Sequence, residues 1–385
     1  MIKEPEEILN IGTNSDVDLF ESRMNYLLVG QDRAIRTFSR TYQLALAGLH
    51  SLNRPLGTLL FLGPTGVGKT ASVEAAADAW FSNPDGFIKV DCGEMQYGHE
   101  IAKLVGSPPG YLGHKETQPM ITQEKLGQFS HEKAPLSLIL FDEIEKANDS
   151  LFQLLLGILD RARMTLGDNR EVDFSRTVVV MTSNLGAREI SELVGGGIGF
   201  VRSRDEDNPE IDKKIYKIAK EAAKRKFSPE FFNRITKLIV FRRLKTEHYK
   251  RILDIELTKL QDIITRTVNE ERKFVFRCTD AAKDFLLEKG IDRKYGARPL
   301  GRTIEKYLTV PFSNLILSGQ VHTGNLILAD YIIGADELIF KRGSVIVGDS
   351  DENGWSDLKR QIQLYSKSDD GPEEASAKKA KNATR

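Results

Sequence analysis

The chain has 385 residues, of which 40% are hydrophobic, and this length exceeds one ordinary core, so we expect two domains with tails. Lysine plus arginine and aspartate plus glutamate each number 55, and this zero formal net charge gives no global indication of a nucleic-acid or lipid-surface binder. No stretch approaches about eighteen uninterrupted apolar residues, and the N-terminus lacks a signal-peptide core. The sequence therefore predicts a soluble, cytoplasmic protein without a membrane partner.

Short apolar runs separated by segments with helical periodicity predict a parallel α/β sheet. The runs lie at residues 58–62, 87–90, 138–141, 178–181 and 238–241. Two helices are predicted by stripes spaced three and four residues apart: Leu151, Leu155, Ile158, Leu159 and Ala162, and then Ile211, Ile215, Ile218 and Ala222. We expect both stripes to pack against the sheet.

The pattern changes after residue 241. A long amphipathic helix is predicted from about Glu247, followed by a β-rich run at 274–276, further helices and a β-like ending at 338–340. The residues after Tyr365 are polar, free of aromatic side chains and charge-segregated, which is typical of a disordered tail. We therefore expect an N-terminal extension over 1–27, a large domain over 28–244, a smaller α+β lid domain over 245–350 and a disordered charged tail over 351–385.

A phosphate-binding pattern, G-x-x-x-x-G-K-[ST], follows the first predicted strand and precedes an Ala-rich helical run. Its residues are Gly63, Pro64, Thr65, Gly66, Val67, Gly68, Lys69 and Thr70. The glycines let backbone N–H groups turn toward one point, at the positive end of the new helix. Lys69 is expected to reach the β- and γ-phosphates, and the Thr70 hydroxyl to bind Mg²⁺. The pattern predicts a nucleotide site, and by itself it also fits a kinase, a transporter subunit or a GTPase.

Polar residues at the ends of two later strands suit the chemistry of hydrolysis. Asp142 and Glu143 directly follow the run at 138–141. There Asp142 is expected to organise the Mg²⁺ shell, and Glu143 to orient and deprotonate the attacking water. Asn184 follows the next run and suits a contact with the γ-phosphate, although taken alone it equally suits a turn cap.

Two arginines also stand out. Arg234 precedes the fifth strand, and Arg298 lies in the predicted small domain. The ordinary interpretation of each is a surface charge. A guanidinium group can, however, stabilise the charge that develops on a transferred phosphoryl group, either in cis or from a neighbouring subunit. A donor in trans requires an oligomer.

At this point six ordered motifs resemble the Clp-type AAA+ ATPases, specifically the second ATPase module of the ClpA, ClpB and ClpC unfoldases. The matching segments are 28–32 before the ATPase core, 63–70 (Walker A), 138–147 (Walker B), 181–184 (sensor 1), 228–234 (arginine finger) and 296–300 (sensor 2). The resemblance extends to about residue 345. It implies a P-loop AAA+ fold, with a five-stranded parallel sheet flanked by helices and a C-terminal lid domain. It also implies ATP and Mg²⁺ as cofactors.

The same resemblance assigns roles to single residues. Leu28 and Val29 would flank the adenine. Asp142 and Glu143 would take the Walker B roles, and Asn184 would be sensor 1. Arg234 would act on the neighbour's nucleotide and Arg298 would contact the γ-phosphate in cis. The family forms hexameric rings, which would supply the oligomer that Arg234 requires.

Residues Gly110, Tyr111, Leu112 and Gly113 resemble the family's substrate-gripping pore loop. A tyrosine on a glycine-flanked loop offers a flat, amphipathic surface that can hold many kinds of side chain. Without the resemblance, a Pro-Gly turn with a packed tyrosine would be preferred. With it, we expect the chain to act on polypeptide substrates.

Ile198, Gly199 and Phe200 form a small hydrophobic tripeptide in a glycine-rich segment. They resemble the loop with which ClpA and ClpC dock into a Clp-type peptidase, and which ClpB-like disaggregases lack. A loop whose Ile and Phe pack against its own ring is an equal alternative. The double-ring relatives also carry an N-terminal substrate domain and a first ATPase module, which do not fit into the segment before Leu28. We therefore expect substrate choice to reside in that segment, in the charged tail or in an adaptor.

Three functions follow from these patterns. The first is an ATP-driven protein unfoldase or remodeller, which threads polypeptide through a homo-oligomeric ring, either alone or as the ATPase subunit of a Clp-type protease. The second is a nucleic-acid-acting AAA+ ATPase of the loader or initiator type, but no DNA-binding motif or basic run is found outside the tail. The third is a nucleotide-switched scaffold, against which the full set of hydrolytic residues argues.

Overall fold

The structure is a computed structural model that describes residues 14–107, 118–129, 134–194, 209–292 and 296–344. The chain divides into two compact units. The first comprises Met1–Ile255 and Gly290–Gly301, and the second comprises Glu256–Lys289 and Arg302–Arg385. We describe each unit by itself.

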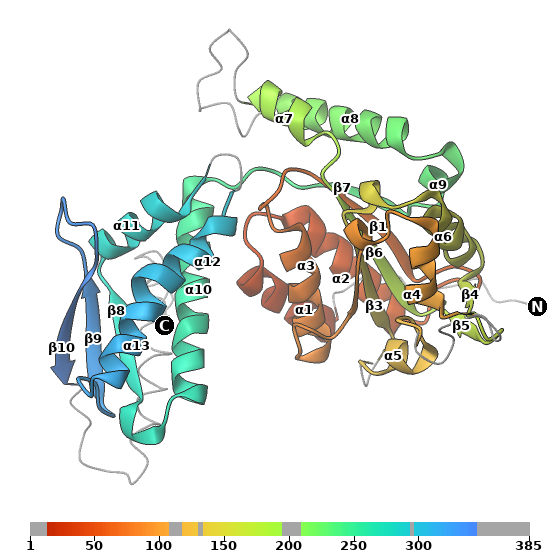
Figure 1. Ribbon diagram of the computed structural model, residues 1–385. Coiled ribbons are helices and arrows are strands. Elements are labelled where there is room, and N and C mark those ends of the chain that lie inside the picture. The colour runs from red at the N-terminus through yellow and green to blue at the C-terminus, as the bar shows by residue number, and fades with distance from the viewer. Residues whose placement is uncertain (1–13, 108–117, 130–133, 195–208, 293–295, 345–385) are drawn as a thin grey trace, which may run out of the picture. The chain divides into compact units, whose positions relative to one another are not determined.

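A parallel sheet forms the centre of the first unit (Figure 1). Its five strands are β1 (Gly57–Leu62), β2 (Ile88–Asp91), β3 (Ser137–Asp142), β6 (Thr177–Ser183) and β7 (Lys237–Val240). They lie in the order β2-β3-β6-β1-β7, and every neighbouring pair is parallel. The predicted parallel α/β sheet is thereby confirmed, with each strand within two residues of its predicted position.

Helices cover both faces of this sheet, as is usual for parallel strands. The helices of the first unit are α1 (Ser15–Leu27), α2 (Asp32–Leu46), α3 (Lys69–Phe81), α4 (Ala102–Val105), α5 (Gln123–Gly127), α6 (Asp149–Arg161), α7 (Ala187–Val194), α8 (Pro209–Lys226) and α9 (Pro229–Asn233). Figure 1 shows α1, α2 and α3 on one side of the sheet and α4 and α6 on the other. A small antiparallel hairpin, β4 (Arg163–Thr165) and β5 (Glu171–Asp173), follows α6.

Alternation along the strands divides the core between the two faces. Along β1, Leu59 and Phe61 pack with the residues of α1, α2 and α3, whereas Leu60 and Leu62 pack with those of α6 and α8. The predicted stripe on α6 is buried throughout. The stripe on α8 is only partly buried, with Ala222 as its most buried member. The sheet is thus packed on both faces, and its strand ends position the loops that follow them.

The second unit is a mixed α/β layer. It contains most of α10 (Thr246–Thr267) and of α11 (Asp280–Gly290), the end of α12 (Arg298–Ile304), and all of α13 (Val310–Leu317), β8 (Phe274–Cys278), β9 (Asn325–Asp330) and β10 (Ile339–Ser344). β9 pairs in parallel with β8 and antiparallel with β10. Phe312 packs its ring against Phe274, Phe276 and Phe340, which joins α13 to the sheet.

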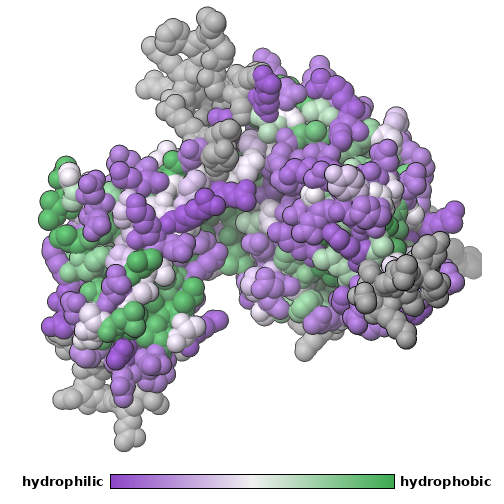
Figure 2. Space-filling model, in the orientation of Figure 1, coloured by the Kyte–Doolittle hydropathy of each residue, from purple (hydrophilic) through white to green (hydrophobic). Residues whose placement is uncertain are grey.

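The surface of the second unit carries apolar side chains over α13 (Figure 2). The exposed large hydrophobic residues of α13 are Val310 and Leu317, at 51% and 79% exposure. Throughout the described parts of the chain, every helix is too short or too polar to span a membrane.

Candidate nucleotide site

Strand register brings three of the predicted site segments together. Leu62, the last residue of β1, lies beside Ser183 of β6, so the phosphate loop and Asn184 leave the sheet next to each other. Phe141 of β3 lies beside Met181, which puts Asp142 next to Thr182. Because the strands are parallel, all of these residues lie at the carboxyl edge of the sheet, where ligands of such folds bind.

Two glycines of the phosphate loop are required by geometry. Gly63 has φ +147°, and a Cβ there would lie 2.8 Å from the carbonyl oxygen of Phe241. Gly68 has φ +97° and caps α3 without a side-chain hydrogen bond, so the first N–H groups of the helix remain available. These groups and the helix dipole favour an anion at this position.

Lys69 is buried at the centre of the loop, with 9% of its surface exposed. Its Nζ donates to the carbonyl oxygens of Gly63 and Pro64, both at 2.7 Å, and to Oδ1 of Asn184 at 2.9 Å. Burial lowers the pKa of Lys69 to about 8, against the opposing effect of nearby carboxylates, of which Glu145 is the strongest. A bound phosphate would replace the carbonyl partners and favour the charged amine.

Oxygen ligands suited to Mg²⁺ meet beside Lys69. The hydroxyl of Thr70 donates to Oδ2 of Asp142 at 3.4 Å, and the hydroxyl of Thr182 donates to Oδ1 of the same carboxylate. Among the described residues no group of three or more His, Cys, Asp or Glu side chains could hold a metal ion. Thr70 and Asp142 nevertheless fit Mg²⁺, because this ion commonly binds through one or two protein oxygens together with substrate phosphates and waters.

Glu143 has an unusual backbone for a non-glycine residue. Its φ of +55° lies in the left-handed region, which costs about 1–3 kcal/mol and is found where function demands it. The hydroxyl of Thr182 holds this conformation by accepting from the Glu143 N–H at 3.0 Å. The Glu143 carboxylate accepts from Asn184 Nδ2 at 3.2 Å and pairs with Lys146. A carboxylate held at both oxygens is positioned to receive a proton from an ordered water.

Two contributors to this edge were not assigned a role from the sequence. Thr182 is fully buried and joins Asp142 to the backbone of Glu143. Glu145 Oε1 accepts from the Asn184 N–H at 3.1 Å, which fixes the turn that presents the Asn184 amide. The apolar run of β6 indicates from the sequence only that Thr182 is buried. The role of Thr182 follows instead from the register of β6 with β3, which places it next to Asp142.

The segment before the ATPase core lies against the phosphate loop. Leu28 and Val29 are both buried, and the Cδ1 atom of Leu28 lies 3.6 Å from the position of a Cβ on Gly68. Gln31 Nε2 donates to the carbonyl oxygens of Val67 and Arg242, at 3.0 and 3.1 Å. An apolar surface of this kind suits an adenine ring.

Arg298 belongs to the segment that the structure groups with the first unit, although the sequence analysis assigned it to the lid domain. The N–H of the preceding Ala297 donates to the Gly66 carbonyl oxygen at 3.4 Å, and Gly296 packs directly on Gly66. The Arg298 side chain is exposed. The residues that precede it, Gly296 and Ala297, contact the phosphate loop at Gly66. Arg298 is therefore near the loop, but in the described part of the chain its side chain makes no hydrogen bond or ion pair with Lys69 or Asn184.

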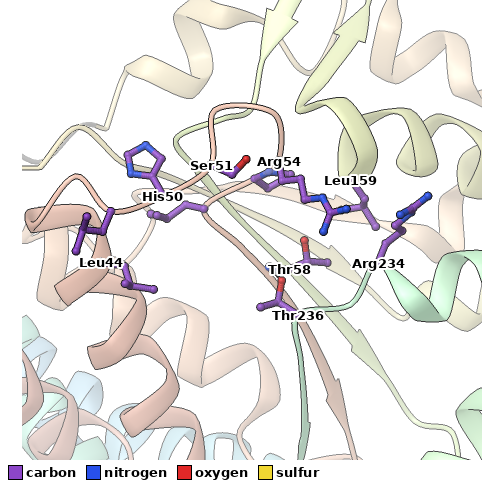
Figure 3. A pocket seen from close by; sticks show the side chains of 11 residues that line it. Leu44, His50, Ser51, Arg54, Thr58, Leu159, Arg234 and Thr236 are labelled. Atoms are coloured by element: carbon purple, nitrogen blue, oxygen red, sulfur yellow. Dashed lines mark hydrogen bonds between the residues drawn. The ribbon is translucent and has the colours of Figure 1, made fainter.

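Arg234 lies away from these residues. It lines a pocket with Thr58, near the start of β1, and with Thr236, which precedes β7 (Figure 3). This is the amino edge of the sheet, opposite to the phosphate loop. The structure thus brings Lys69, Thr70, Asp142, Glu143 and Asn184 together and leaves Arg234 apart.

Two of the predicted segments lie outside the described residues. They are the pore-loop residues Gly110, Tyr111, Leu112 and Gly113, and the tripeptide Ile198, Gly199 and Phe200.

Comparisons with known proteins agree with this geometry. A family model described as "AAA domain (Cdc48 subfamily)" matches residues 54–238, which include the phosphate loop, Asp142, Glu143, Asn184 and Arg234. The fold and the site therefore define a AAA+ ATPase that binds nucleotide. A second model, described as "C-terminal, D2-small domain, of ClpB protein", matches residues 244–329. Together with the relatives below, these matches establish that the chain belongs to the Clp-type AAA+ ATPases, as its motifs predicted.

Curated relatives match most of the chain. The chaperone protein ClpB of Rhizobium meliloti (strain 1021) is 36% identical over 324 residues, which cover 84% of this chain and 34% of the relative. The ATP-dependent Clp protease ATP-binding subunit ClpC of Staphylococcus aureus (strain USA300) is 38% identical over 311 residues, which cover 81% of this chain and 36% of the relative. The chain thus spans about a third of the length of the curated relatives that it matches.

Solved structures of Hsp104 share the fold. A closed-state structure of Hsp104 with ATPγS and FITC-casein superposes with a TM-score of 0.69 at 29% identity, covering 86% of this chain and 52% of the other. An extended Hsp104–casein complex of S. cerevisiae gives a TM-score of 0.70 at 28% identity, covering 86% of this chain and 53% of the other.

Proposed function

We propose that this chain assembles into a ring, hydrolyses ATP there with Mg²⁺ and uses the energy to unfold or remodel polypeptides. The observation that carries the proposal is the separation of its hydrolytic residues. Asn184 bonds to both Lys69 and Glu143, and Thr182 joins Asp142 to Glu143, while Arg234 lies at the opposite edge of the same sheet. A complete hydrolytic site then needs Arg234 from a second copy.

Each residue has a defined task in this reaction. Lys69 and the N–H groups of α3 bind the phosphates, and Asn184 orients the attacking water near the γ-phosphate. Glu143 accepts the proton of that water as the oxygen attacks phosphorus and the bond to ADP breaks. Mg²⁺, held through Thr70 and Asp142, would screen the phosphate charge. Arg234 of the next copy and Arg298 would stabilise the charge that develops on the γ-phosphoryl group.

The mechanical part of the proposal rests on Tyr111 and on the relatives. Solved Hsp104 structures contain casein, a polypeptide, and the curated relatives are named as chaperones or as subunits of a protease. These similarities do not favour the alternative of a nucleic-acid-acting AAA+ ATPase. We propose that Tyr111 contacts the polypeptide as the ring threads it.

The test compares ATP hydrolysis with unfolding of a tagged protein. In Tyr111→Ala, hydrolysis should persist while unfolding is lost, because an alanine offers no flat surface to grip. Tyr26→Ala removes a tyrosine that is 59% exposed on α1 and should change neither rate. Unfolding that survives in Tyr111→Ala would refute threading, and hydrolysis stimulated by DNA in a salt-dependent manner would favour the nucleic-acid alternative.

A Clp-type peptidase is the partner that the tripeptide Ile198, Gly199 and Phe200 suggests. Its deletion should abolish co-purification with such a peptidase and leave ATP hydrolysis unchanged. Equal recovery of the peptidase with the intact and deleted chains would remove this partner and leave a stand-alone remodeller.

A further inference from the structure

A second group of basic residues lies at the amino edge of the sheet. They surround a cavity of about 210 Å³ that the nucleotide network does not use. The lining residues are Leu44, Leu49, His50, Ser51, Arg54, Pro55, Leu56, Thr58, Leu159, Arg234 and Thr236. In Figure 3, the Arg54 side chain extends from its loop toward the side of the pocket that carries Leu159 and Arg234.

The charges of this cavity are not balanced within the described chain. Arg234 Nε lies 2.6 Å from Oδ1 of Asp160, as an ion pair without hydrogen-bond alignment. Arg54 has no ion pair or hydrogen bond with any residue that the structure describes. Both ring nitrogens of His50 are shielded from solvent and lack a hydrogen-bond partner among the described residues. Buried polar atoms of this kind usually have a partner, which a ligand can supply.

An anion bound here cannot be the nucleotide of the same copy. Thr58 lines the cavity, whereas the phosphate loop begins at Gly63. These residues are separated by the length of β1, about 16 Å at roughly 3.3 Å per residue. An arginine side chain does not bridge that distance, so the anion must come from outside the chain.

The rim of the cavity is suited to contact with another protein. Leu44 of α2 and Leu49 of the loop that carries Arg54 line the cavity and are 45% and 72% exposed, and Leu52 of the same loop is 70% exposed. An apolar rim around a basic centre is typical of a surface that becomes covered on assembly. The proposed function already requires a second copy at Arg234, and that copy carries a phosphate-binding loop.

We propose that Arg54 is a second guanidinium donor, beside Arg234, to the terminal phosphates of the nucleotide held by the next copy of this chain. This inference rests on the proposed function, because it requires the assembly in which Arg234 acts in trans. Two arginines on one face can share the negative charge that develops on the γ-phosphoryl oxygens. The planar fork of Arg54 gives directional donors that a lysine would lack.

The test mixes two variants with impaired ATP hydrolysis. Glu143→Gln lacks the base but retains Arg54, and Arg54→Ala retains the base but lacks the cation. Each variant alone should hydrolyse ATP about tenfold more slowly than wild type or worse. In a mixture, an Arg54→Ala chain can receive Arg54 from a neighbouring Glu143→Gln chain. Hydrolysis should therefore exceed the sum of the two separate activities.

Matched mixtures separate this inference from the proposed function. Arg234→Ala mixed with Glu143→Gln tests the arrangement in trans, and Arg36→Ala, an exposed arginine on α2, is the control that should hydrolyse ATP at the wild-type rate. Sedimentation shows which chains are assembled. Suppose that ATP hydrolysis recovers when Arg234→Ala is mixed with Glu143→Gln, but not when Arg54→Ala assembles with Glu143→Gln. This result would overturn the inference about Arg54 and leave the proposed function intact. Failure of both mixtures would overturn the proposed function as well.

Two further results bear on the inference. A wild-type rate in Arg54→Ala alone would overturn it, because the guanidinium would then be dispensable. Arg54→Lys keeps the charge and should assemble with an intermediate rate, whereas a rate no better than that of Arg54→Ala would favour the directional donors that the inference assigns.

Discussion

The two edges of the central sheet differ in how completely their polar groups are paired. At the carboxyl edge, Lys69, Asp142, Glu143 and Asn184 are joined by hydrogen bonds within one copy. At the amino edge, Arg54 and His50 lack partners in the described chain, and Arg234 has only Asp160. The polar groups of the carboxyl edge are thus held in place within one copy, whereas the amino edge is, in our proposal, covered by a second copy.

The largest effect is expected from the base at the carboxyl edge. Glu143→Gln should lower ATP turnover by about 10²- to 10⁴-fold, because the amide cannot accept the proton of the attacking water. ATP binding should persist, since Lys69 and the phosphate loop are unchanged. Turnover and the binding of a fluorescent ATP analogue measure the two effects.

Glu74→Gln is the matched control, because Glu74 is exposed on α3 and outside the network. Its turnover should equal that of wild type. Rapid hydrolysis in Glu143→Gln would instead assign the base to another residue.

An effect that grows with pH is expected from Lys69. Its pKa of about 8 in the folded protein is below the ordinary value of 10.5, so the buried amine loses its proton as the pH rises through 8. Phosphate binds the protonated amine. ATP affinity should therefore be constant below pH 8 and fall above it by up to about tenfold per pH unit.

Titrations between pH 7 and 9.5 measure this affinity, and calorimetry in buffers of different ionisation enthalpy should show proton uptake on binding above pH 8. An affinity independent of pH across that range would exclude the lowered pKa. The same shift also predicts that the nucleotide-free fold gains stability between pH 8 and 10.5, where the buried amine is neutral but an unfolded lysine is still charged.

A smaller effect is expected from Thr182, which organises the carboxyl edge without contacting phosphate. Thr182→Val keeps the shape but loses the bonds to Asp142 and to the Glu143 N–H. Turnover should fall about tenfold, and the free energy of unfolding should fall by about 1 kcal/mol because those part-buried groups lose a hydrogen-bond partner. Steady-state kinetics and denaturant unfolding measure the two changes.

Ser39→Ala is the control for Thr182→Val, since Ser39 is also buried, and within the described ranges its hydroxyl bonds only to Ile35 of its own helix. It should affect neither turnover nor nucleotide affinity. If Thr182→Val hydrolysed ATP at the wild-type rate, the strained Glu143 backbone would not depend on that hydroxyl.

The sequence predicted the sheet and much of the carboxyl edge because both depend on local patterns. Short apolar runs identified every strand of the large sheet, and residues that end parallel strands necessarily meet at one edge. This argument was sufficient to associate Asp142 and Asn184 with the phosphate loop. The strand β9 was not predicted, although Leu326, Ile327 and Leu328 form a short apolar run there, and its place in the sheet is defined by pairing with β8 and β10.

Other features depend on contacts between distant parts of the chain. The positive φ of Glu143 depends on Thr182, which is 39 residues away. Gln31 joins the phosphate loop to Arg242 across 211 residues. Arg54 precedes β1 in a loop, and only the folded position of that loop brings it to the pocket that Arg234 lines. Composition and periodicity carry no information about such contacts.

The most direct test of a site divided between two copies is ATP turnover per chain, measured at saturating ATP over a wide range of protein concentration, together with the assembled fraction from sedimentation. Turnover per chain should rise in parallel with the assembled fraction, because an isolated copy has the carboxyl edge but no arginine from a neighbour. Turnover per chain that stays constant while the assembled fraction changes would contradict the account.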